Sequence, residues 1–301
     1  MPELPEVETI CRGLSREVVS KKINKISIKK RNLVKNSQSF FRKVLIGNSF
    51  VKIDRIGKLL IFVLKKSDQS EKQYLLIHLK MTGQLVYCDP EKFVVGGHVN
   101  SSEEEVQFIK KDRENFCQPG KYTHIIFKFQ DGSSLFFNDL RQFGYLKIVS
   151  DDELQDIKSK YGIEPEQPNF TFVNFKKALG VRRANIKATL LNQAIISGLG
   201  NIYVDEALFS AKIHPQRLVN SLTGQEQKLL FTSIKRIIRL AIKYNGTTFS
   251  DFVDCEGQKG NFKQKLKVYG QQNKKCKQCN EKIQKIKVAG RGTHFCIKCQ
   301  R

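Results

Sequence analysis

Four cysteines near the carboxyl end of the chain have the spacing of a metal site. Cys276 and Cys279 form one C-x-x-C pair, and Cys296 and Cys299 form a second. Two such pairs can bring four thiolates into a tetrahedron around zinc and close a small β-hairpin. Four sulfur ligands leave no open coordination position, so we expect one structural zinc ion (Zn2+) that does no chemistry. An iron–sulfur site or unliganded thiols are the alternatives.

A reactive amine is available at the other end of the chain. Once Met1 is removed, Pro2 presents a secondary amine whose pKa lies near the α-amino range of roughly 7.7–8.0. The unprotonated amine can attack a sugar C1′ and form a cationic iminium, which draws electrons from the sugar. Glu3 and Glu6 lie beside it in the sequence and can transfer protons. Taken alone, the run Pro2–Glu6 is also an ordinary helix start.

A glycine-containing turn, Gly198–Asn201, is the third candidate site. Glycines let the backbone approach a ligand closely, and the amino end of the following helix offers unpaired N–H groups to a phosphate. Arg182, Arg183 and Lys187 precede the turn and favour phosphate binding over a plain helical hairpin.

The charge of the chain indicates a polyanionic partner. Lysine and arginine number 53 against 29 acidic residues, a formal net charge of +24. Nucleic acid is the partner that best fits such an excess, ahead of an acidic membrane surface. The excess is concentrated in residues 256–301. A lysine-rich proteome is the other explanation, and charge alone names no reaction.

Targeting signals and a disulfide framework are not expected. The first twenty residues include acids and no apolar core of a secretory signal, and no run approaches the roughly 18 apolar residues of a membrane span. Cysteines outside the two C-x-x-C pairs are scattered, which favours a reduced compartment. We expect a cytoplasmic protein in which Cys11, Cys88, Cys117 and Cys255 are free thiols.

The elements that must position these groups change character near residue 160. Residues 5–19 have helical periodicity, and residues 23–149 have short β-rich runs, which predicts a β-sandwich capped by the first helix. Residues 88–120 interrupt the runs with the acidic stretch Ser101–Glu105 and are expected to be a solvated insertion. Beyond Pro165 and Pro168 helices dominate, and the longest follows the capping box of Thr223 and Glu226.

Several sequence runs resemble one family. Met1–Thr9 resembles the opening of formamidopyrimidine-DNA glycosylases, and the likeness covers nearly the whole chain apart from residues 88–120. Further matching runs are Arg55–Lys58, His78–Gly83, Asp139–Gly144, Gly200–Leu208, Val268–Gly270 and the cysteines with Gln300.

The resemblance implies an α+β multidomain fold. Residues 1–160 would form the catalytic β-sandwich with its capping helix, and residues 161–255 a helix–two-turn–helix DNA-binding domain. Residues 256–301 would hold a lesion-capping loop and a β-hairpin zinc finger.

The resemblance also implies a bifunctional enzyme of base-excision repair. It would remove oxidised purines (8-oxoguanine and formamidopyrimidines) and then nick the abasic site by β,δ-elimination. Pro2 would be the Schiff-base nucleophile and Glu3 the acid/base at the sugar. Lys58 would donate the proton for β-elimination, and Arg291 would donate the proton for δ-elimination and bind phosphate.

Other positions are expected to contact DNA. Met81, Arg141 and Phe143 would fill the gap left by the extruded nucleotide, because apolar wedges fill an unstacked hole and a guanidinium can pair with the orphaned base. The remaining expected DNA contacts are Glu6, His78, Tyr122, Arg182, Lys187 and Asn201. The partner would be damaged double-stranded DNA, bound by a monomer associated with the nucleoid.

Some positions depart from the family's usual residues. Lys80 stands for a glycine, Leu140 for a proline, Gln142 for a second arginine and Tyr122 for a histidine. These changes leave the reaction intact and bear on lesion preference. The alternatives are an endonuclease VIII-like glycosylase for oxidised pyrimidines, a catalytically silent DNA-binding relative, and a zinc-ribbon adaptor. The first usually has glycine where Leu4 stands, and the last two do not explain the retained run from Pro2.

Overall fold

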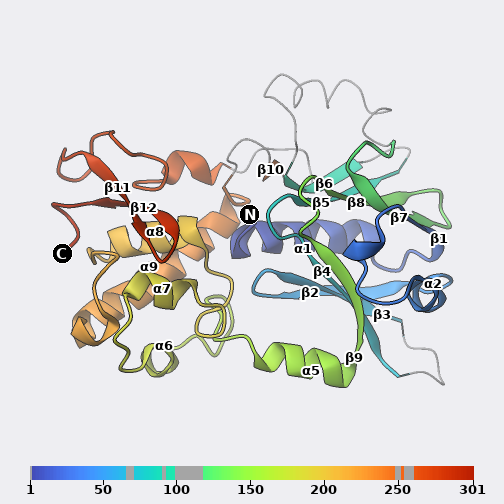
Figure 1. The fold of residues 1–301 in the computed structure, drawn as a ribbon, viewed down its shortest axis with the longest axis horizontal. Coiled ribbons are helices and arrows are strands. Elements are labelled where there is room, and N and C mark those ends of the chain that lie inside the picture. Colours follow the sequence, from blue (N-terminus) through green and yellow to red (C-terminus); the bar gives the residue numbers. More distant parts are fainter. Residues whose placement is uncertain (1, 66–70, 90–92, 99–117, 248–251, 254–260) are drawn as a thin grey trace. The chain divides into compact units, whose positions relative to one another are not determined.

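The computed structural model describes residues 2–65, 71–89, 93–98, 118–247, 252–253 and 261–301 (Figure 1). These form two compact units, Met1–Lys158 with Asn245–Asn261, and Ser159–Tyr244 with Phe262–Arg301. Most of the expected insertion (88–120) and of the expected lesion-capping loop lies outside the described residues. Residues 93–98 of that range form strand β6 and pair with the strand Gly83–Cys88, so they belong to the sandwich and not to an insertion. Within the described residues no helix is long and apolar enough to cross a membrane.

The first unit contains the expected β-sandwich and helix. One antiparallel sheet has the order β2 (Phe50–Ile56), β3 (Leu59–Leu64), β4 (Gln73–His78) and β9 (Tyr145–Ser150). The other has the order β1 (Ile23–Ile28), β7 (Thr123–Phe129), β8 (Ser134–Asp139), β5 (Gly83–Cys88), β6 (Phe93–His98) and β10 (Phe252–Val253). The η1 turn (Arg31–Leu33), α2 (Gln38–Leu45) and α5 (Asp151–Ser159) complete this part of the chain.

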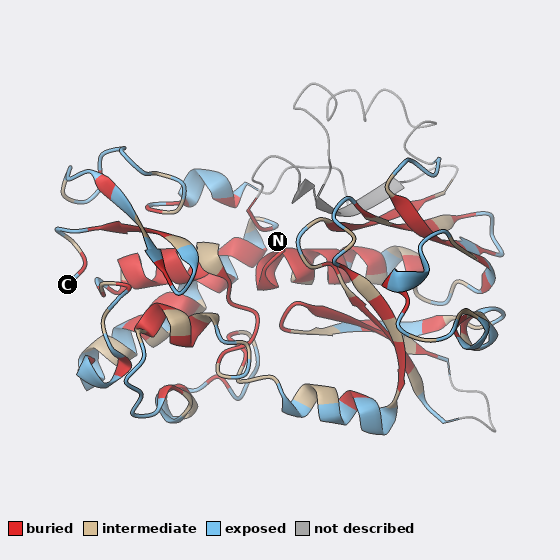
Figure 2. Cartoon of the chain, in the orientation of Figure 1, coloured by how far each residue is buried: buried red, intermediate tan, exposed pale blue. Residues whose placement is uncertain are grey.

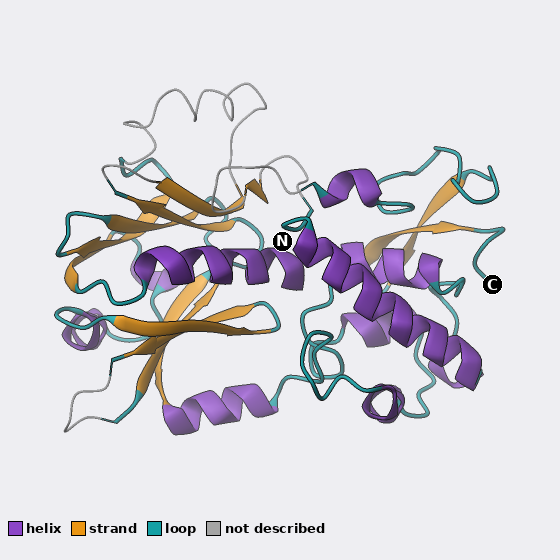
Figure 3. Ribbon diagram, turned by 180° about the vertical axis from the view of Figure 1, so that it is seen from behind, coloured by secondary structure: helices purple, strands orange, loops and turns teal. Residues whose placement is uncertain are grey.

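Helix α1 (Leu4–Val18) runs between the two sheets (Figures 1 and 3). Pro5 occupies its first turn, where a missing N–H removes no helical hydrogen bond. The predicted apolar stripe is confirmed, because Val7, Ile10 and Leu14 are buried in the same core as residues of both sheets. The sandwich core therefore fixes the helix whose amino end carries Pro2.

The second unit is helical and ends in a β-hairpin. Its elements are α6 (Phe172–Leu179), α7 (Ile186–Leu191), α8 (Asn201–Ser210), η2 (Val219–Ser221), α9 (Gly224–Lys243), η3 (Phe262–Lys265), β11 (Ile283–Val288) and β12 (Arg291–Cys296). The capping box predicted for α9 is confirmed at Thr223 and Glu226. Helix α8 is buried on every side from Tyr203 to Phe209, which makes it the central element of this unit (Figure 2).

The cysteines outside the metal motif differ from expectation at one position. Cys88, at the end of β5, forms a disulfide bond, so the prediction of a free thiol there is wrong. Pairing depends on whether two Cα atoms lie about 4.4–6.8 Å apart, which scattered sequence positions do not reveal. Cys11 is a free thiol as predicted, and burial raises its pKa to about 12. Cys117 and Cys255 lie outside the described residues.

Candidate active site and nucleic-acid interface

The amino end of α1 holds Pro2 and Glu3 in a buried position. Glu3 and Glu6 form a capping box, in which the Glu3 backbone N–H donates to Oε2 of Glu6 over 2.9 Å. Oε1 of Glu6 accepts the backbone N–H of Thr247 over 2.8 Å. Gly246 precedes it with φ +81°, and a Cβ there would lie 2.7 Å from the same oxygen. Both oxygens of Glu6 thus bind backbone, an arrangement that positions the helix start.

Lys58 and His78 lie next to each other in the first unit. Lys58 follows the turn residue Gly57 (φ +55°), and the next residue, Leu59, pairs with His78 across the β3–β4 ladder. Burial, and then the nearby charges of Lys80 and Lys58, lower the pKa of His78 to about 3. The imidazole is therefore neutral at physiological pH. Its Nδ1 accepts the Lys80 backbone N–H over 3.0 Å, which leaves Nε2 as the protonated nitrogen and a donor.

Met81, Arg141 and Phe143, which we call the reading head, come together at the surface of the first unit. Nη1 of Arg141 lies 3.1 Å from Sδ of Met81, and its guanidinium carbon lies 4.6 Å from the centre of the Phe143 ring. Met81 is 39% and Phe143 52% exposed, although both side chains are large and apolar. Exposed apolar side chains gathered around a cation are typical of a surface that meets a partner.

Two positions that depart from the family's usual residues have an uncommon backbone conformation. Lys80 has φ +52° and Gln142 has φ +54°, both in the left-handed region. That region costs an ordinary side chain roughly 1–2 kcal/mol, which is the reason a glycine is usual at position 80. The neighbouring Tyr122 is half-buried, and its carbonyl accepts the Asp139 N–H over 3.0 Å.

In the second unit, the structure brings Asn201 and Arg291 to the same place. Asn201 begins α8, and its Nδ2 donates to the Gly292 carbonyl over 2.8 Å. Arg291 is exposed and opens β12 after a tight turn at Ala289 (φ +49°) and Gly290 (φ +72°). The hairpin tip and the open amino end of α8 therefore present donors together, as an anion site requires.

Lys187 does not lie at a surface, so the expected DNA contact is wrong for this residue. Its side chain is 0% exposed, and Nζ lies 2.5 Å from Oδ1 of Asp205, which is also 0% exposed. Oδ2 of Asp205 accepts the backbone N–H of His294 in β12 over 2.8 Å. The ammonium is paired inside the protein because a buried charge requires a partner. Arg182, in contrast, is exposed, and its Nη1 donates to the Ala178 carbonyl over 2.6 Å.

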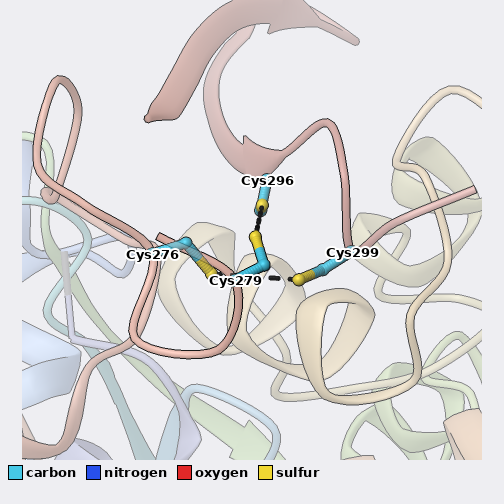
Figure 4. Close-up of side chains that lie close together, drawn as sticks. All are labelled: Cys276, Cys279, Cys296 and Cys299. Carbon is cyan, nitrogen blue, oxygen red and sulfur yellow. Dashed lines mark hydrogen bonds between the residues drawn. The ribbon is translucent and has the colours of Figure 1, made fainter. Parts of the chain in front are cut away.

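The four predicted metal ligands form a cluster (Figure 4). Their Sγ atoms lie within 4.8 Å of one another, with 3.9 Å between Cys276 and Cys299 and 3.4 Å between Cys279 and Cys296. A tetrahedral zinc ion with Zn–S bonds of about 2.3 Å needs sulfurs about 3.8 Å apart. The sulfurs point toward one another from the loop before β11, from the end of β12 and from the turn that follows β12, so their geometry fits zinc.

Three buried acids carry structural roles that the sequence reasoning missed. They are Asp139 beside the reading head, and Asp205 and Glu206 in α8. Glu206 accepts the backbone N–H groups of Lys267, Val268 and Tyr269 over 2.9–3.0 Å. The signal was available for α8, because two adjacent acids within an otherwise apolar helix need internal partners.

Comparisons with known proteins agree along the whole chain. Family models described as formamidopyrimidine-DNA glycosylase N-terminal domain, formamidopyrimidine-DNA glycosylase H2TH domain, and zinc finger found in FPG and IleRS match residues 1–146, 161–253 and 273–301. The formamidopyrimidine-DNA glycosylases of Pelotomaculum thermopropionicum and Ligilactobacillus salivarius are each 38% identical to it, over 100% of this chain and 99% of theirs.

Solved structures give the same result. A Lactococcus lactis FPG mutant in complex with Fapy-dG-containing DNA has a TM-score of 0.84 and 35% identity, covering 100% of both chains. The Lactococcus lactis Fpg with abasic-site DNA has a TM-score of 0.82 and 35% identity, covering 99% of both chains. The wild-type Lactococcus lactis FPG with DNA containing an oxidised pyrimidine has a TM-score of 0.82 and 35% identity, covering 100% of both chains.

Proposed function

This chain belongs to the formamidopyrimidine-DNA glycosylase family, and on that premise we infer that it is a base-excision-repair glycosylase and abasic-site lyase acting on oxidised purines in double-stranded DNA. The observation that carries this function is the retained amino end, where Pro2 and Glu3 are held by the capping box of a helix in the sandwich core. A catalytically silent relative would have no need to retain Pro2 and Glu3.

Pro2 acts as the nucleophile in this mechanism. Its amine forms a bond to C1′ of the damaged nucleotide while the bond from C1′ to the base breaks. The C1′–O4′ bond then breaks as Glu3 transfers a proton to O4′, which opens the sugar ring and leaves an iminium between Pro2 and C1′. The resulting iminium draws electrons from the sugar, so a C2′ proton is lost and the 3′ C–O bond breaks, followed by the 5′ C–O bond. Lys58 and Arg291 donate protons in the first and second eliminations.

Phosphate binding uses groups whose donor state is fixed. The neutral His78 donates from Nε2 without a change of charge across physiological pH. The Asn201 amide has a second hydrogen beyond the one that it donates to Gly292, and the amino end of α8 adds backbone N–H groups. Arg291 and Arg182 supply exposed positive charge.

We assign the cysteine cluster one structural zinc ion. Cys276, Cys279, Cys296 and Cys299 would hold it, and with four sulfur ligands it would order the hairpin that carries Arg291. The enzyme acts as a monomer on damaged duplex DNA, in the cytoplasm and associated with the nucleoid, because the duplex itself supplies the second face of the interface.

Borohydride trapping tests the nucleophile. The processed protein should form a covalent complex with a duplex that contains 8-oxoguanine opposite cytosine, and none with the undamaged duplex. A form that retains Met1 should not react, because the Pro2 nitrogen is then an amide, and Pro2→Gly should retain part of the trapping. Full trapping with Met1 still attached would point to a lysine nucleophile. A matched oxidised-pyrimidine duplex in the same experiment tests the endonuclease VIII-like alternative.

A further inference from the structure

Asp139 is a buried carboxylate directly beneath the reading head. It ends β8, is 0% exposed, and pairs with Gly83 of β5. Hydrogen bonds to residues at the start of β7 fix its backbone. The Asp139 N–H donates to the Tyr122 carbonyl, and the Asp139 carbonyl accepts a hydrogen bond from Nε2 of His124 over 2.8 Å. The residue therefore has one defined position.

The side chain of Asp139 joins the two turns that carry the reading head. Oδ1 accepts the Thr82 hydroxyl and the Arg141 backbone N–H, the latter over 3.2 Å, and Oδ2 accepts the Gly144 backbone N–H over 2.7 Å. The Thr82 hydroxyl also accepts the Arg141 N–H over 3.0 Å. Met81 precedes Thr82, so one carboxylate sets the Met81 turn against the Arg141–Gly144 turn.

These contacts hold a turn that would otherwise relax. The segment between the two held N–H groups includes Gln142 in the left-handed region, which is unfavourable for a side chain of this kind. The fit around the carboxylate is close, since a Cβ on Gly144 would lie 3.0 Å from Oδ2 and 2.8 Å from the Phe137 ring. An ionised carboxylate accepts on both oxygens, whereas an amide in either orientation turns an N–H toward a donor.

We propose that Asp139 is the positioning residue of the reading head and thereby sets the choice of opposite base without touching DNA. The proposal rests on the proposed function and on the expectation from the family resemblance that Met81, Arg141 and Phe143 fill the gap left by the extruded nucleotide. Asp139 acts through the backbone of Arg141 and Gly144, so its loss should alter discrimination through Arg141.

Single-turnover excision by Asp139→Asn tests this, on duplexes with 8-oxoguanine opposite cytosine or adenine. The ratio of the two rates should fall about tenfold, because a hydrogen bond to a buried charge changes an equilibrium by about that factor. In an Arg141→Ala background the same substitution should leave the ratio unchanged. Asp152→Asn, which changes an exposed carboxylate in α5, is the matched control and should keep the wild-type ratio. Thr82→Val should lower the ratio, and Thr82→Ser should retain it.

Amide hydrogen exchange of the 139–144 segment measures positioning independently of activity. It should be faster in Asp139→Asn, while exchange in the second unit stays the same. The proposal is overturned if the variant keeps wild-type exchange in this segment, keeps the wild-type rate ratio, or lowers the ratio equally in the Arg141→Ala background. A wild type without excision activity on either duplex, but with faster exchange in the variant, would refute the proposed function and leave the positioning role supported.

Discussion

Replacing Lys187 by methionine removes one partner of a fully buried ion pair. Both side chains are 0% exposed, and Nζ lies 2.5 Å from Oδ1 of Asp205, so neither charge has water as a substitute partner. Removing one member of such a pair costs about 3–5 kcal/mol, because the remaining Asp205 carboxylate stays buried without an opposite charge and keeps, among the described residues, only its contacts to His294. A unit of this size loses roughly 2–4 °C of Tm per kcal/mol, so we expect a fall of about 10 °C in the transition of the second unit.

Calorimetry measures the stability, and the salt dependence of DNA binding separates the two roles that Lys187 could have. A lysine that neutralises one phosphate changes the slope of log K against log [salt] by about 0.9. We expect the slope of Lys187→Met to equal that of the wild type when both are measured well below their transitions. Lys228→Met, at an exposed position of α9, is the control for loss of a lysine without a buried partner. A variant with wild-type stability and a slope reduced by about one would refute the burial argument.

Three further outcomes are expected. Cys279→Ser should lower the bound zinc measured by metal analysis and speed amide exchange in the finger, since metal binding and folding are coupled in such small sites; retained zinc would contradict this. Arg141→Ala should lower the ratio of the excision rates opposite cytosine and adenine in single-turnover assays, by a factor that corresponds to about 1–3 kcal/mol, the range of a good base contact. An unchanged ratio would mean that another residue discriminates the opposite base. The pKa of His78 is lowered to about 3, so the unfolded chain binds a proton there at higher pH than the folded chain does. The free energy of unfolding should therefore fall as the pH drops from 6.5 to 3, by up to about 1.4 kcal/mol per pH unit more in the wild type than in His78→Gln. Urea unfolding measures this, and the same pH dependence in both proteins would show that the pKa of His78 is not lowered.

Local sequence patterns predicted the elements of this fold well. The apolar stripe of α1 and the capping box of α9 appear where periodicity and residue type placed them. The four cysteines also form the predicted cluster, because two C-x-x-C pairs on a short hairpin have few other ways to place their thiols. Such features depend on neighbours within a few residues, and that is the range over which a single sequence is informative.

The burial and pairing of individual polar side chains and cysteines were not revealed by the sequence. Lys187 follows two arginines and precedes a glycine turn, so it was predicted to be a surface cation. In the structure its ammonium pairs with Asp205, which is buried because other elements surround α8 on every side. The prediction of a free thiol at Cys88 was wrong for the same reason, since a disulfide bond depends on the distance in space between two cysteines. Partners far apart in sequence decide whether a polar side chain binds a ligand or the protein itself.

A metal site in the finger does not by itself fix the orientation of the hairpin that carries Arg291, and contacts with helix α8 fix it. A four-sulfur site orders the hairpin locally but leaves its orientation on the helical module undefined. Three polar side chains of α8 supply that orientation. Asn201 holds the carbonyl of Gly292, Asp205 holds the N–H of His294, and Glu206 holds three backbone N–H groups of residues 267–269. Because a buried helix is rigid, these contacts fix the position of the hairpin tip relative to α8. This explains why acids lie inside an apolar helix: Asp205 fixes the hairpin three residues after Arg291, and Glu206 fixes the segment that leads into the finger.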